Sequence, residues 1–156
     1  MKKVLLPFIA LILLTACNNN DKKQEGDSNK EAPKTQADSL MNDVMDGHNV
    51  GMAKYTKLNE MEKKVKAALD SISKLPAKVQ QASMNYKLNL ESLGKDLRNA
   101  IISMDKWMEE FNMDSALNNA EQRIKYLTDE KLKVGKVKEA ILGSLQKADS
   151  LLKEKL

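Results

Sequence analysis

Residues 79–111 read VQQASMNYKLNLESLGKDLRNAIISMDKWMEEF, and this stretch decides the fold. Its apolar residues recur at alternating steps of three and four, which is the period of one face of an α-helix. The stretch contains no proline and only one glycine, so nothing in it forces a break. We therefore predict one helix over about 77–112. The stripe consists of Val79, Ala82, Tyr86, Leu90, Leu93, Leu97, Ala100, Met104, Met108 and Phe111.

Two further stripes of the same period flank this one. They predict helices over about 38–75, which Pro76 ends, and over about 114–155, where the step across Lys131 is irregular. Asp38 or Ser39 is the expected N-cap of the first helix and Asp114 that of the third. The first stripe consists of Met41, Met45, His48, Met52, Tyr55, Leu58, Met61, Val65, Leu69, Ile72 and Leu75. The third consists of Leu117, Ala120, Ile124, Leu127, Val134, Val137, Ile141, Leu145, Ala148 and Leu152.

Three long amphipathic helices joined by short connections predict an all-α domain. The connections at 75–77 and 112–114 are short enough to make successive helices antiparallel neighbours. The composition agrees, because Leu, Met, Ala, Lys, Glu and Gln dominate and aromatic residues make up only 4%. We expect an up-down-up three-helix bundle with coiled-coil-like packing over 37–156, as a monomer or a weak dimer.

The N-terminal residues predict export and lipid attachment. Met1-Lys2-Lys3 is a short basic segment, and residues 4–14 form an apolar run too short to span a bilayer. The run ends in Leu14-Thr15-Ala16-Cys17, the pattern of a bacterial lipobox. We expect a signal peptide over 1–16 and lipidation of Cys17, with acyl chains such as palmitate holding the protein to a membrane. The alternative is an ordinary secretory signal that leaves a free Cys17 thiol.

Residues 18–36 are polar and charged, so residues 17–36 predict a lipidated cysteine followed by a disordered tether. The chain has 26 basic residues, of which Lys2 and Lys3 would leave with the signal, against 22 acidic ones. This near balance argues against nucleic acid as a partner. We expect the cell envelope as the location, with the periplasmic side of the outer membrane favoured. Cys17 is the only cysteine, so no intramolecular disulfide is available.

Met45, His48 and Met52 are the candidate metal ligands. Residues three and four apart are neighbours on a helix, and thioethers with an imidazole suit Cu(I) and other soft ions. The simpler interpretation, which we favour at this stage, is that these side chains fill the core. We therefore expect no cofactor and keep a soft-metal or haem-type site as the alternative.

Gly47 and Gly51 lie one turn apart beside His48 and either admit a close neighbour or soften the helix. Trp107 is expected to close one end of the core or to face a partner. The candidate interaction patch is thus Met45, Gly47, His48, Gly51, Met52 and Trp107.

Several segments resemble small helical lipoproteins of Bacteroidota that often carry the label "viral A-type inclusion protein". The resemblance rests on Met41-x-x-Val44-Met45-x-x-His48-x-x-x-Met52, Ala100-x-x-x-Met104-x-x-Trp107-Met108-x-x-Phe111, Tyr126-Leu127 and Val137-Lys138-Glu139-Ala140-Ile141-x-x-Ser144. It implies an envelope lipoprotein of the same fold and names no activity. Asn49 and Ala53 stand where that family commonly has Asp and Pro. The missing acid weakens a charge-assisted or metal-binding role for His48, and the missing proline weakens a helix kink.

Catalytic motifs are missing from the sequence: there is one histidine, and no phosphate loop, zinc motif or paired-carboxylate motif is present. The sequence therefore favours a non-catalytic, lipid-anchored spacer or protein-binding module with an envelope protein as partner. A soft-metal binder and a carrier of lipid or another apolar ligand are the alternatives.

Overall fold

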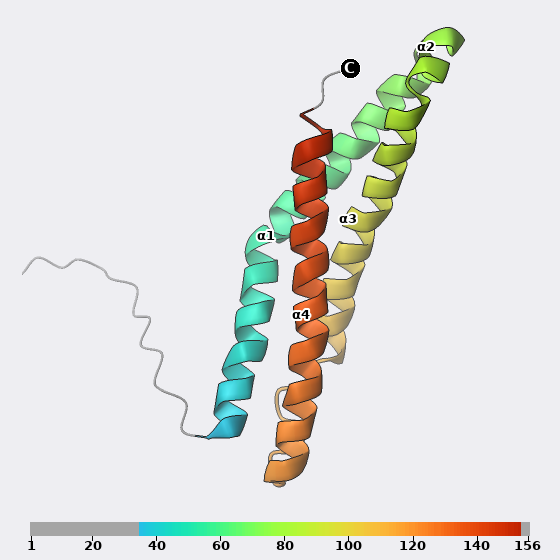
Figure 1. Ribbon diagram of the computed structural model, residues 1–156. Coiled ribbons are helices and arrows are strands. Elements are labelled where there is room, and N and C mark those ends of the chain that lie inside the picture. The colour runs from blue at the N-terminus through green and yellow to red at the C-terminus, as the bar shows by residue number, and fades with distance from the viewer. Residues whose placement is uncertain (1–34, 154–156) are drawn as a thin grey trace, which may run out of the picture. The chain divides into compact units, whose positions relative to one another are not determined.

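The computed structural model describes residues 35–153, and every regular element in that range is a helix. The elements are α1 (Gln36–Ser73), α2 (Ala77–Ala82), α3 (Met84–Glu110) and α4 (Ala120–Leu151), shown in Figure 1. The predicted signal peptide, Cys17 and the tether up to residue 34 lie outside the described residues. None of the described helices combines the length and the apolar character needed to cross a membrane.

α1 begins earlier than predicted because Thr35, not Asp38 or Ser39, is its N-cap. The Thr35 hydroxyl oxygen accepts a hydrogen bond from the Asp38 backbone N–H at 3.1 Å and donates to the Asp38 carboxylate at 2.8 Å. Asp38 is the third residue of the helix, where its negative charge suits the helix dipole.

The segment predicted as one helix over 77–112 is divided at Ser83 into α2 and α3. α2 is tied to the end of α1 through Gln80, whose side-chain amide donates to the carbonyl oxygens of Ser73 and Leu75 at 3.0 and 2.8 Å. The bond to Ser73 satisfies a carbonyl group that the last turn of a helix leaves without a partner.

The last helix starts six residues later than predicted, at Ala120. Asp114 lies in a turn, where its backbone N–H donates to the Asn112 side chain at 2.9 Å, and Ala116 has a positive φ of 57°. The N-cap is Asn119, whose side-chain oxygen accepts from the Gln122 backbone N–H at 3.0 Å. The connection after α3 is therefore a loop over 111–119 instead of a tight turn.

Polar pairs between helices show how the three long helices run. The ion pairs Lys131–Asp43 at 2.8 Å and Lys57–Asp149 at 2.9 Å join α4 to α1. From the first pair to the second the residue numbers increase on both helices, so α1 and α4 are parallel. α3 runs the opposite way, as Figure 1 shows. Its pairs with α1 are Tyr55–Asp105 at 2.6 Å and Arg98–Glu62 at 2.8 Å, and its pair with α4 is Lys147–Asp96 at 2.7 Å.

The core lies along the line where these three helices meet. Its fully buried large side chains are Val44, Leu58, Val65, Ile72, Leu90, Leu97, Met104, Val134 and Ile141. The predicted stripes hold through most of this line, but three stretches differ from the prediction. At the start of α1 the inward positions are taken by Val44, Gly47 and Gly51. In α3 Trp107 is buried while Met108 is exposed. In α4 Glu130 is buried, and Leu117, predicted to start this stripe, lies exposed in the preceding loop.

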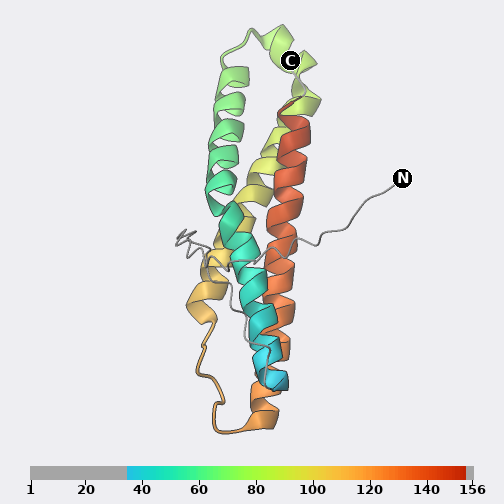
Figure 2. The ribbon, with the colours of Figure 1, turned by 90° about the vertical axis from the view of Figure 1, so that its left-hand side faces the viewer.

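α1 and α3 continue past the end of α4. Lys147 of α4 pairs with Asp96, and Leu151 lines the same groove as Asn89, so α4 ends level with the first turns of α3. α3 begins at Met84, five residues before Asn89, so at about 1.5 Å per residue it extends roughly 8 Å beyond α4. Figures 1 and 2 show this extension with α2 at its tip. Val79, Met84 and Leu88 are exposed at this end of the domain, and we call these three residues the hairpin tip.

Candidate functional site: the first half of α1 and the Trp107 cluster

Gly47 and Gly51 lie where α1 comes closest to the other helices. A Cβ added to Gly47 would stand 2.9 Å from Val134 Cγ1 on α4. A Cβ added to Gly51 would overlap the end of the Met104 side chain on α3 and stand 3.2 Å from Ile141 Cδ1 on α4. The absence of side chains at these two positions is therefore what lets the helices approach. Neither glycine faces an external partner.

Met45, His48 and Met52 lie beside this glycine line, not on it. Met45 and His48 are half-buried and Met52 is 37% exposed. The prediction that these three side chains fill the core is therefore wrong. Residues 44, 47 and 51 take the inward direction, and a residue one position along a helix is turned away by about 100°.

His48 is held between a polar neighbour and an aromatic ring. Its Nδ1 lies 3.1 Å from Asn49 Oδ1, and its ring centroid lies 5.7 Å from that of Trp107 with the planes tilted by 37°. Trp107 in turn stacks on Phe111 at 4.8 Å, and Phe111 on Tyr126 at 6.2 Å. The four rings thus connect α1, the end of α3 and α4.

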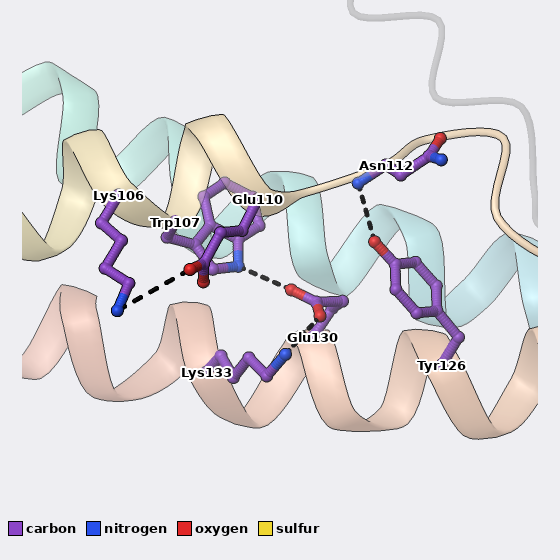
Figure 3. Close-up of polar contacts among 7 residues, drawn as sticks. All are labelled: Lys106, Trp107, Glu110, Asn112, Tyr126, Glu130 and Lys133. Carbon is purple, nitrogen blue, oxygen red and sulfur yellow. Dashed lines mark hydrogen bonds and ion pairs between the residues drawn. The ribbon is translucent and has the colours of Figure 1, made fainter.

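Trp107 also makes the most buried polar contact between α3 and α4. Its indole Nε1–H donates to Glu130 Oε2 at 2.9 Å, and Lys133 Nζ donates to the other oxygen of the same carboxylate at 2.8 Å (Figure 3). Glu130 is buried, and a buried carboxylate is tolerated when hydrogen bonds satisfy it. The hydrogen bond to Glu130 raises the pKa of Lys133, and the attraction of the two charges adds to this.

Polar contacts fix the chain where it leaves α3. The Asn112 backbone N–H donates to the Tyr126 hydroxyl oxygen at 2.7 Å, and Lys106 and Glu110 form an ion pair at 3.7 Å (Figure 3). Arg123 reaches back from α4 to the Ser115 carbonyl oxygen at 2.7 Å. Trp107 and its neighbours therefore close this end of the core, which is the first of the two roles expected for Trp107.

Two hydrogen bonds between α1 and its neighbouring helices each shift the pKa of one of their partners. The Tyr55 hydroxyl donates to Asp105 at 2.6 Å, and this hydrogen bond, with burial and the Asp105 charge, raises the pKa of Tyr55. The hydrogen bond from Lys57 lowers the pKa of Asp149, an exposed group on α4. Both contacts join different helices and help to set their register.

The structure separates the residues of the predicted interaction patch into a buried group and an accessible group. Gly47, Gly51 and Trp107 are buried against other helices, so only Met45, His48 and Met52 are accessible. Among the described residues no three His, Cys, Asp or Glu side chains gather as they would to hold a metal ion. The sequence did not predict the positions of two residues near this site. Glu130 is a charged residue that is buried in α4, and Met108, which the predicted stripe places in the core, is exposed beside Trp107.

An open groove of about 510 Å³ lies between α3 and α4. Its one acidic side chain, Asp96, is paired with Lys147 at 2.7 Å. The remaining lining residues are Asn89, Ser92, Leu93, Gln146, Ser150 and Leu151. A carboxylate that is ion-paired with a lysine, among small polar and aliphatic side chains, does not form a catalytic acid–base pair.

No protein-family model, curated protein or solved structure matches the chain.

Proposed function

We propose that the chain is a bacterial lipoprotein, anchored through Cys17 in the cell envelope, whose helical domain is a non-catalytic module that binds another envelope protein. The proposed location rests on one observation, the sequence Leu14-Thr15-Ala16-Cys17 at the end of a short apolar run. A diacylglycerol on Cys17 supplies the two acyl chains that stable anchoring requires. The periplasmic face of the outer membrane is the location we favour.

The folded unit that we propose for this role is an up-down-up three-helix bundle made of α1, α3 and α4. Its support is the parallel pairing of α1 with α4 and the antiparallel pairing of both with α3. α1 has 38 residues, so at about 1.5 Å per residue it places its two ends roughly 57 Å apart. A module of this length holds its hairpin tip well away from the end at which the tether joins.

The hairpin tip is the surface that we propose for partner binding. Val79, Met84 and Leu88 are exposed at the end of the domain where α2 lies. Exposed apolar side chains grouped at one end of a domain are typical of a protein contact. The expected partner is an envelope protein with an apolar groove or patch.

Crosslinking and affinity capture from native membranes, read by mass spectrometry, tests this proposal with a matched pair of variants. Leu88 and Ile102 both lie on α3 and are both 54% exposed, but only Leu88 belongs to the hairpin tip. We expect Leu88→Glu to lose the captured partner and Ile102→Glu to keep it. If no protein is captured reproducibly, or if both variants capture it equally, the hairpin tip is not a binding surface.

A further inference from the structure

We propose that Met45, His48 and Met52 of α1, together with Met108 of α3, bind one Cu(I) ion at the edge of the α1–α3 contact. The three α1 side chains are turned out of the core because Val44, Gly47 and Gly51 occupy the inward positions. Two thioethers and the only histidine of the chain therefore lie on one partly exposed face of α1.

Asn49 prepares the histidine for this role. When His48 Nδ1–H donates to Asn49 Oδ1, across 3.1 Å, the other ring nitrogen, Nε2, keeps its lone pair. Protein metal sites commonly hold a ligating imidazole in this way, with the second nitrogen bonded to an oxygen that fixes the tautomer and the ring. Asn49 is thus a positioning residue, and Nε2 is the proposed ligand atom.

The register of α1 and α3 adds a thioether from the second helix. Tyr55 contacts Asp105, so Met52, three residues back on α1, lies level with Met108, three residues on along antiparallel α3. Met52 and Met108 are both 37% exposed. Methionine side chains are long and flexible, which lets sulfurs on two adjacent helices converge on one ion.

The chemistry of these ligands selects a soft, singly charged ion. Thioethers and imidazole suit Cu(I), whereas Mg²⁺ and Ca²⁺ require oxygen ligands. The nearest buried carboxylate, that of Glu130, is already bonded to Trp107 and Lys133. Trp107 borders the site on its core side, 5.7 Å from His48 between ring centroids, and it is the only tryptophan of the chain.

The test is an anaerobic titration of the full chain with Cu(I) in competition with the chelator bicinchoninate. The protein is held in detergent, carries no histidine tag, and has Cys17→Ser throughout so that no thiol binds copper. We expect one Cu(I) per chain, with quenching of the Trp107 fluorescence. Met52→Leu and Met108→Leu should each weaken binding about tenfold, because they keep the apolar volume but remove the sulfur.

Met84→Leu is the matched control, since Met84 is also an exposed methionine of α3 but lies at the hairpin tip. It should leave Cu(I) binding unchanged, and circular dichroism should show that every variant stays folded. The proposal is overturned if no Cu(I) is taken from the chelator, if His48→Ala and Met52→Leu together leave binding intact, or if Met84→Leu weakens it equally. Uptake of Zn(II) in preference to Cu(I) would overturn the assignment to a soft ion.

Discussion

Replacing Gly47 by alanine should destabilise the protein, although alanine is the better helix former. In an unpacked helix position the exchange gains up to about 1 kcal/mol of helix propensity. Here the new Cβ would stand 2.9 Å from Val134 Cγ1. Valine is branched at Cβ and has one strongly preferred rotamer in a helix, so it cannot turn its methyl group away.

Overpacking of this kind typically costs about 1–3 kcal/mol. The clash therefore outweighs the gain in propensity, and we expect Gly47→Ala to lower the free energy of unfolding by about 1 kcal/mol. Gly135→Ala on α4 is the matched control, because nothing lies within 4 Å of an added Cβ there. It should raise the free energy of unfolding by up to about 1 kcal/mol.

The assay is urea unfolding followed by circular dichroism at the helix minimum, on the wild-type protein and both variants. A third variant that combines Gly47→Ala with Val134→Ala tests the cause, because removal of the valine methyl groups makes room for the new Cβ. The double variant should lose less free energy of unfolding than the two single variants lose together. Equal stabilisation by Gly47→Ala and Gly135→Ala would refute the close approach of α1 to α4.

Three further predictions concern single contacts. Glu130→Ala should lower the free energy of unfolding, measured in urea, by about 2–3 kcal/mol, because it leaves the buried indole N–H without an acceptor. Glu130→Gln keeps an acceptor and should cost under about 1 kcal/mol. Equal losses for the two variants would contradict the contact. Ala116→Gly should raise the melting temperature, since Ala116 has a φ of 57° that glycine adopts without strain, and a lower melting temperature would speak against that conformation. The raised pKa of Tyr55, caused by its hydrogen bond to Asp105, adds stability that is fully present below pH 10 and is lost as the pH rises through the folded-state pKa. Tyr55→Phe should therefore reduce the alkaline loss of stability in unfolding curves measured from pH 8 to 12, and an unchanged pH profile would argue against this bond.

The helical class of the domain follows from the sequence because long stripes of period three and four leave no other regular structure available. The end of the loop over 111–119 was harder to predict. Met113 and Leu117 continue the helical period, yet both are exposed. The signal that decides the boundary is Asn119, since a side chain that caps a helix start competes with continuation of the preceding helix.

The arrangement of the candidate site could not be read from apolar periodicity. Gly47 and Gly51 contribute no apolar side chain to a stripe, so the stripe predicted from the sequence runs through Met45, His48 and Met52 instead. A close neighbour is one of the two roles that the sequence predicts for these glycines, and the positions of Val134 and Met104 show that it is the correct one. Glu130 was missed for a related reason: a charged residue on an inward stripe becomes stable there only because Trp107 on another helix donates to it.

Anchoring through Cys17 is the central claim of the proposed function, and the intact mass of the protein purified from bacterial membranes tests it most directly. The account predicts a mature chain that begins at Cys17 and carries a diacylglycerol, with Cys17→Ala abolishing both the added mass and membrane association. A chain that begins at Cys17 or nearby with a free thiol, or one that keeps residues 1–16, would contradict it.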